Sequence, residues 1–247
     1  MDVLGIDIGG SYIKGAIVDV RTGELRSECL QVETPQPATP QAIIEATHKL
    51  VKLFNWHGLM GCGFPAVIQA GIAKTAANID SLWIGIDVQK QLQQATGCPG
   101  SVLNDADAAG LAEMEFGAGE GRSGTVLVLT LGTGIGSALF SQGELVPNLE
   151  LGCLPINGAP AEHYAAAAVR SREKLSWQAW AQRLNLFLNH VERIFSPELI
   201  IIGGGISCEY KTFFPQLKIE SDLLPAHFFN QAGIVGAACF AAEKSHA

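Results

Sequence analysis

Residues 3–14 read Val-Leu-Gly-Ile-Asp-Ile-Gly-Gly-Ser-Tyr-Ile-Lys: a short apolar run, two glycines and the start of a second apolar run that continues to residue 20. Two apolar runs joined by a tight glycine turn predict a β-hairpin rather than a strand followed by a helix. Asp7 lies near the end of the first run, where a buried carboxylate is costly unless it is paired or holds a metal. Glycine amides approach phosphate chains closely, so this hairpin is a candidate phosphate-binding loop formed by Asp7, Gly9, Gly10, Ser11 and Lys14.

A second stretch of the same kind lies in the other half of the chain. Residues 125–131 are apolar and lead into Gly132-Thr133-Gly134-Ile135-Gly136, after which residues 137–140 resume the apolar run. A dinucleotide-binding loop needs a helix after its glycines, whereas a turn at Gln142-Gly143 favours a second hairpin. A plain β-turn is the alternative for either loop taken alone. Two such loops in one chain favour phosphate binding, with contacts from Gly132, Thr133 and Gly134.

A third junction between an apolar strand and glycines follows at residues 199–205, which read Leu-Ile-Ile-Ile-Gly-Gly-Gly. One interpretation is a tight turn before a helix. The other is a flat platform, formed by Gly204 and Gly205, against which a nucleotide or another phosphoryl donor lies.

Asn104-Asp105-Ala106-Asp107 follows a short predicted strand at 101–103. Phosphoryl transfer to an alcohol requires mainly positioning and charge stabilisation, and a carboxylate near the attacking hydroxyl can accept its proton. Asp105 is therefore the candidate catalytic base, and Asn104 the candidate to hold a neighbouring hydroxyl. A helix N-cap is the alternative for Asp105 and the favoured interpretation for Asp107.

The strand–glycine turn–strand pattern occurs once in each half, which predicts two similar α/β domains facing each other across a cleft. We expect a small N-terminal domain from residues 1–107, joined by a C-terminal helix over 232–247, and a larger domain from residues 108–231. Further strands are expected near 25–32 and 61–67, and further helices over 42–54, 108–116, 161–169 and 177–195.

The composition limits the partners of the protein. Of 247 residues, 48% are hydrophobic and 16% charged, with a formal net charge of −8. A negative charge argues against non-specific binding to nucleic acid or to anionic membranes. No apolar run approaches the roughly 20 residues that span a bilayer, and the start of the chain does not resemble a signal peptide, so we expect a cytoplasmic location. The six cysteines include no C-x-x-C pair, so no zinc site is expected.

Together these segments resemble the ROK family of sugar kinases, and within it the polyphosphate glucokinase branch. The most specific stretches are Leu103-Asn104-Asp105-Ala106-Asp107-Ala108-Ala109-Gly110-Leu111-Ala112-Glu113 and Thr34-Pro35-Gln36-Pro37-Ala38-Thr39-Pro40. Further matches run from Gly5 to Ala238 with similar spacing, so the resemblance covers nearly the whole chain.

The resemblance implies the actin-like ATPase (ribonuclease H-like) fold and transfer of a terminal phosphate from polyphosphate or ATP to the 6-hydroxyl of glucose, with Mg²⁺. It places Asp105 on the catalytic base and implies a homodimer. Asp7 would contact Mg²⁺ through water. The sugar-binding positions fall on Asn78, Asn104, Glu150, Cys153 and Glu162.

The chain departs from the family pattern at several of these positions. The family usually has Glu-x-Gly-His at the sugar site, and here Cys153 replaces the histidine. A thiol is a weaker hydrogen-bond donor than an imidazole. Ala66 stands where the family usually has glycine, so its methyl group is expected to crowd the loop that lies against the sugar. Acidic or neutral residues replace basic ones on the expected donor path, which leaves four candidate cations: Lys14, Lys74, Arg122 and Lys211.

Two alternatives to a glucokinase follow from these departures. One is a kinase for another hexose or an amino sugar, with the pocket reshaped by Cys153 and Ala66. The other is a sugar-binding sensor without turnover, against which the retention of Asp105 counts.

Overall fold

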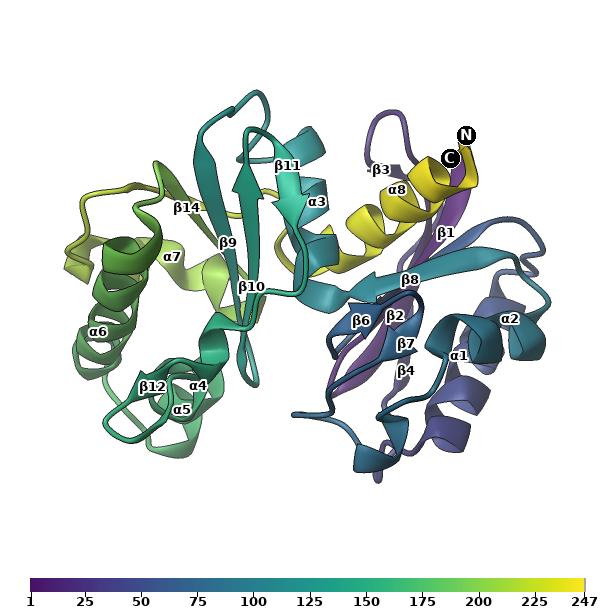
Figure 1. Ribbon diagram of the computed structural model, residues 1–247, viewed down its shortest axis with the longest axis horizontal. Helices are drawn as coiled ribbons and strands as arrows, with labels where there is room; N and C mark the ends of the chain where they lie inside the picture. Colours follow the sequence, from purple (N-terminus) through teal and green to yellow (C-terminus); the bar gives the residue numbers. More distant parts are fainter. Residues whose placement is uncertain (247) are drawn as a thin grey trace. The chain divides into compact units, whose positions relative to one another are not determined.

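The computed structural model describes residues 1–246, and of His246 the backbone alone. Residue 247, which the predicted C-terminal helix includes, lies outside the described residues. The chain divides into two compact units (Figure 1): unit 1 contains Met1–Ala112 and the last helix α8 (Ala232–His246), and unit 2 is Glu113–Asn230. The division lies between Ala112 and Glu113 rather than after Asp107, inside helix α3 (Asp105–Phe116).

Unit 1 is built on a six-stranded mixed sheet. Its strands run in the order β3-β2-β1-β5-β8, with β4 also paired to β2. The pairs within β3-β2-β1 are antiparallel and those within β1-β5-β8 are parallel. The predicted third strand at 25–32 is in fact two short strands, β3 and β4. The bounds are β1 (Asp2–Ile8), β2 (Tyr12–Asp19), β3 (Glu24–Leu25), β4 (Leu30–Glu33), β5 (Met60–Phe64) and β8 (Gly100–Asn104).

Successive side chains of β1 point to opposite faces of this sheet, and each face is covered by different helices. Leu4, Ile6 and Ile8 are buried in one core with side chains of α1 (Pro40–Leu53) and α2 (Val88–Thr96). The intervening Gly5 faces α8, because a Cβ atom there would overlap the carbonyl of Ile234. Gly61 of β5 meets the backbone of α8 in the same way. The last helix therefore packs directly on β1 and β5, and Figure 1 shows it alongside β1.

Unit 2 repeats this topology. Its sheet has the order β11-β10-β9-β14-β15, with an antiparallel meander followed by parallel strands. The same strand order in both units is the actin-like, ribonuclease H-like architecture that the sequence resemblance implies. The bounds are β9 (Thr125–Leu131), β10 (Ile135–Ser141), β11 (Glu144–Val146), β14 (Leu199–Gly203) and β15 (Asp222–Pro225).

The long helix α6 (Trp177–Phe195) covers the core of unit 2 and buries an apolar stripe that includes Trp180 and Phe187. The predicted helix at 161–169 is interrupted at Ala166, whose backbone is extended. The Trp180 indole N–H lies within hydrogen-bond distance of the carbonyls of Ala165 and Ala166, so this tertiary contact accompanies the break. The two resulting helices are α4 (Glu162–Ala165) and α5 (Ala167–Arg172).

Short elements complete the fold. Beyond the helices given above, the described residues include β6 (Ile68–Gln69), β7 (Ile72–Ala73), β12 (Pro155–Ile156), β13 (Ala159–Pro160), α7 (Tyr210–Phe213) and the 3-10 turns η1 (Ser81–Trp83), η2 (Leu151–Cys153), η3 (Gly205–Glu209), η4 (Phe214–Gln216) and η5 (Phe229–Gln231). No helix in this part of the chain is both long enough and apolar enough to cross a membrane.

A buried carboxylate fastens the two ends of unit 2 to each other. Glu113, the first residue of the unit, is fully buried. It accepts hydrogen bonds from the amides of Ala118 at 3.0 Å, His227 at 2.9 Å and Phe228 at 2.8 Å. His227 and Phe228 belong to the segment by which the chain leaves the unit, so its entry and exit lie side by side.

Candidate active site

Asp105 is the first residue of α3, directly after β8. The preceding residue, Asn104, is buried, and its Oδ1 accepts hydrogen bonds from the amides of Ala106 at 2.9 Å and Asp107 at 3.0 Å. Asn104 is therefore the N-cap of α3. The predicted helix start at residue 108 and the capping role suggested for Asp107 are wrong, because the helix begins three residues earlier under the cap of Asn104. Asp105 lies in the first turn, where the helix dipole favours a negative charge.

The amide of Asn104 also holds the loop that contains Ala66. Its Nδ2 donates to the carbonyl oxygen of Ala66 at 3.1 Å, and the Ala66 side chain is itself buried. One N–H of Asn104 thus remains without a hydrogen bond to the described residues. Asn78, by contrast, is exposed, in the segment between β7 and η1.

The first glycine loop is the predicted hairpin between β1 and β2. Asp7 and Lys14 are directly opposite each other in the antiparallel register. Burial raises the pKa of the Asp7 carboxyl, and the positive charge of Lys14 partly offsets this increase. Inside the loop, the Gly9 amide donates to the Tyr12 carbonyl at 3.0 Å. Strands β1, β5 and β8 are parallel, so their carboxyl ends lie at the same edge of the sheet. Asp7 lies near the end of β1 and Asp105 directly follows β8, so both residues lie at this edge.

Thr34 anchors this loop, a role that the sequence analysis missed. Its hydroxyl donates to the Gly9 carbonyl at 2.6 Å, and its amide donates to the Ser11 carbonyl at 3.0 Å. The side chain is buried. The specific Thr-Pro-Gln-Pro stretch indicated that Thr34 matters. Its contact with the hairpin could not be predicted from the sequence, because it depends on the pairing of β4 with β2.

The second glycine loop and the glycine platform lie at neighbouring strand ends within unit 2. Gly132, Thr133 and Gly134 connect β9 to β10, and β9 is parallel to β14, which ends at Gly203. Gly204 has a positive φ of 80° and packs against the backbone of Leu131, so only glycine fits there. The loop is held in turn by α5, whose Ala168 amide donates to the Gly132 carbonyl at 3.0 Å. The five predicted donor contacts of unit 2 therefore gather at one edge of its sheet.

The predicted sugar-binding residues of unit 2 also lie close together. Glu150 keeps solvent exposure, yet partial removal of water raises the pKa of its carboxyl, and the negative charge of Glu162 raises it further. Desolvation and the charges of both carboxylates likewise raise the pKa of the exposed Cys153 thiol. Glu162 accepts a hydrogen bond from the Ile135 amide at 3.3 Å, directly after the glycine loop. Two carboxylates and a thiol thus face a common region next to the second loop.

One candidate cation lies away from this region. Arg122 forms an ion pair with Asp222 at 3.4 Å, and Asp222 begins β15. The glycine loop follows the opposite end of β9, roughly 20 Å away at the usual rise per residue of a strand. Arg122 is thus paired with an acidic residue and lies at the other end of β9 from the second glycine loop. Lys211, in α7 shortly after the platform, stays a candidate.

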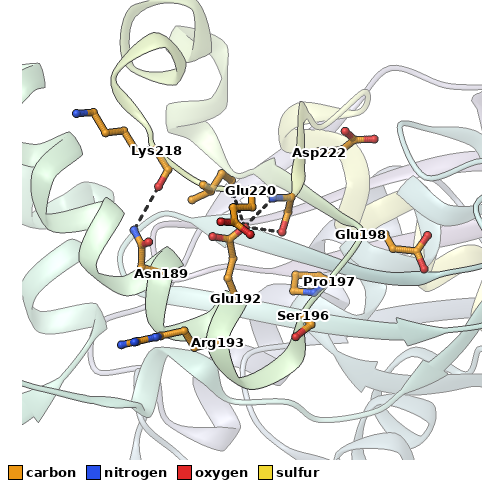
Figure 2. Close-up of a pocket in the computed structure, with 11 residues that line it drawn as sticks. Asn189, Glu192, Arg193, Ser196, Pro197, Glu198, Lys218, Glu220 and Asp222 are labelled. Carbon is orange, nitrogen blue, oxygen red and sulfur yellow. Dashed lines mark hydrogen bonds between the residues drawn. The ribbon is translucent and has the colours of Figure 1, made fainter.

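Elsewhere in unit 2, a hollow of about 920 Å³ lies between the end of α6 and the segment before β15. Figure 2 shows the residues that line it. Its lining includes Glu192, Arg193, Glu198 and Lys218. None of the predicted sugar-binding or donor-binding residues belongs to its lining.

Comparisons with known proteins identify the family of the chain. The ROK family model matches residues 3–148. The polyphosphate glucokinase of Mycobacterium tuberculosis (strain CDC 1551 / Oshkosh) is 43% identical over 235 residues, covering 95% of this chain and 89% of that protein. The crystal structure of an inorganic polyphosphate/ATP-glucomannokinase from Arthrobacter sp. strain KM is 47% identical, covers 98% of this chain and 99% of its own, and has a TM-score of 0.96.

A ROK family glucokinase from Streptomyces griseus, crystallised with glucose and AMPPNP, shows the same fold at 24% identity, with a TM-score of 0.84 over 98% of this chain and the whole of its own. The family match covers more than half of the residues, and the relatives extend it over almost all of them. The chain belongs to the ROK family.

Proposed function

We propose that this protein is a sugar kinase that transfers a terminal phosphate from polyphosphate or ATP to the 6-hydroxyl of glucose. Relatives named for polyphosphate-dependent phosphorylation of glucose are 43% and 47% identical over nearly the full chain. The observation that carries the proposal is the position of Asp105, at the start of α3 beside the capping Asn104 and at the sheet edge that bears the first glycine loop.

In this function, Asp105 accepts the proton of the attacking hydroxyl. The remaining N–H of Asn104 and the carboxylates of Glu150 and Glu162 bind other sugar hydroxyls, with Asn78 and Cys153 as further contacts. Backbone amides of the two glycine loops are proposed to bind the phosphates of the donor, and Gly204 and Gly205 to contact it as well. Little covalent chemistry is required of the protein, so positioning and charge stabilisation supply most of the rate enhancement.

The residues present fit a magnesium ion of the kind that phosphoryl donors carry. Mg²⁺ usually binds one or two protein carboxylates, directly or through water, together with substrate phosphates. Asp7 supplies such a carboxylate beside the first glycine loop, where burial raises the pKa of its carboxyl and a bound cation would favour the ionised form. When bound, the ion would neutralise charge on the donor phosphates.

Several finer features belong to the same proposal. Lys14, Lys74 and Lys211 are the cations proposed to attract a polyanionic donor, in a protein whose net charge of −8 opposes it. We also propose a homodimer in the cytoplasm, as the family resemblance implies.

The test of this function is a coupled assay for glucose 6-phosphate with ATP and with polyphosphate, using the unsubstituted protein and Asp105→Asn. Loss of the base should lower kcat by about 10²–10⁴-fold. The control is Asp87→Asn, which alters another carboxylate at a helix N-terminus of unit 1, where asparagine caps equally well. Absence of product with either donor, or an Asp105→Asn variant that keeps more than a tenth of the activity, would refute the proposal.

Mannose is a second candidate acceptor, favoured by one substitution. Cys153 stands where the family usually has a histidine, and the structural relative at 47% identity is named a glucomannokinase. A panel of hexoses and amino sugars compared by kcat/KM separates the two assignments, since a preference of tenfold or more for mannose would replace glucose as the principal acceptor.

A further inference from the structure

Strand β10 carries a buried hydroxyl that the proposed chemistry does not use. Ser137 is 1% exposed, two residues after Ile135, where the strand begins. Its Oγ donates to the Leu149 carbonyl at 2.6 Å and accepts a hydrogen bond from the Leu151 amide at 3.0 Å. Both contacts are to the backbone of one segment, and the residue between them is Glu150.

A second contact presses the same segment onto β10. A Cβ atom on Gly152 would overlap the carbonyl oxygen of Ile135, so the segment lies directly on the strand. The backbone on either side of Glu150 is thus held to β10, by the serine hydroxyl at Leu149 and Leu151 and by the close approach of Gly152 to Ile135.

The electrostatics explain why such fixing is needed. Glu150 lies near a second carboxylate, Glu162, and both the loss of water and that charge disfavour its ionised form. Repulsion between the two carboxylates favours positions of Glu150 farther from Glu162, so the backbone that carries Glu150 must be held for the two to stay near each other. The side chain of Glu150 makes no capping hydrogen bond to the turn that follows, so the contacts that hold this residue in place are those of the neighbouring backbone at Leu149 and Leu151.

From these contacts we propose that Ser137 is a positioning residue that holds Glu150 in place for the sugar, against the repulsion of Glu162. This inference rests on the proposed function, because it takes Glu150 as a sugar contact. Ser137 itself touches no substrate. Strand β10 also forms one side of the second glycine loop. The same strand therefore adjoins the proposed donor site and, through Ser137, holds the segment of Glu150.

The test compares Ser137→Ala with Ser221→Ala in steady-state kinetics with glucose and ATP. Ser221 is a matched control in unit 2: its hydroxyl donates to Glu192 at 2.6 Å, next to the hollow in Figure 2 and outside the site. Ser137→Ala should raise the KM for glucose about tenfold or more and leave the KM for ATP within about twofold. Ser221→Ala should change neither constant, although both variants lose a hydroxyl hydrogen bond and hence some thermal stability.

Ser137→Cys provides a second variant of similar size that keeps a weak donor and acceptor, and its KM for glucose should lie between those of the alanine variant and the unsubstituted protein. This variant tests the inference even where Ser137→Ala fails to fold. The positioning role is overturned if Ser137→Ala raises the KM for glucose and the KM for ATP equally. It is also overturned if Ser137→Cys has the same kinetics as Ser221→Ala. In either case the kinase function stands. A lack of phosphoryl transfer in the unsubstituted protein overturns the function and the inference together.

Discussion

Replacement of Glu113 by alanine should destabilise unit 2 strongly. The carboxylate is fully buried and accepts hydrogen bonds from three backbone amides. Hydrogen bonds to charged groups contribute about 1.5–3 kcal/mol each, but these amides lie in partly buried surroundings that water would reach after truncation. About 1 kcal/mol for each amide gives a loss of about 3 kcal/mol, a large share of the usual 5–15 kcal/mol.

Urea denaturation followed by circular dichroism measures this loss, and hydrogen exchange of peptides from β9 and β1 assigns it to a unit. With a typical slope of about 1–3 kcal/mol per molar urea, the midpoint of unit 2 should fall by roughly 1–3 M. Glu113→Gln keeps one acceptor oxygen and should lose about half as much. The control is Glu115→Ala, an exposed glutamate of the same helix, where changes stay within about 0.5 kcal/mol. A loss below 1 kcal/mol for Glu113→Ala would show that the three amides find other partners.

Two further predictions concern the two halves of the site. Thr34→Val removes the hydroxyl that donates to Gly9 and should raise the KM for ATP about fivefold with little effect on glucose, whereas Thr47→Val, which removes a buried hydroxyl within α1, should change neither. Glu162→Gln removes a negative charge that raises the pKa of Glu150, so the acidic limb of kcat/KM for glucose should move to lower pH. A limb that stays in place in a pH–rate profile would exclude Glu150 as the titrating group.

Sequence patterns were sufficient to predict the helices and strands that have a regular spacing of apolar residues or that end in glycines. The two glycine hairpins, the long helix α6 and the strand that ends at Gly203 all follow from local residues. Helix α2 was missed because its sequence is rich in glutamine and buries only Val88 and Leu92, although Asp87 and Gly97 mark its ends. Strand β15 was missed for a different reason: it is a short edge strand whose pairing with β14 is set by the fold and not by its own residues.

The site shows the same distinction. Asp105 and the glycine loops each lie within a short stretch of characteristic residues, so the sequence alone could propose them as site residues. Neither the capping role of Asn104 nor the anchoring by Thr34 is visible in a motif, because each depends on where another segment of backbone comes to lie. Charge alone does not tell which end of a strand a loop adjoins, so the sequence could not show that Arg122 pairs with Asp222.

The packing of α8 on β1 and β5 has a consequence for how the protein is made. Gly5 and Gly61 emerge early from the ribosome, but the helix that covers them is synthesised only after the whole of unit 2. At about 5–20 residues per second, synthesis of the 118 residues of unit 2 takes roughly 6–24 s, during which one face of the unit 1 sheet has no cover. Unit 2 is contiguous and has no such dependence. The second half of the protein can therefore reach its native state before the first, and chaperone contacts during synthesis should concentrate on the bare face of β1 and β5.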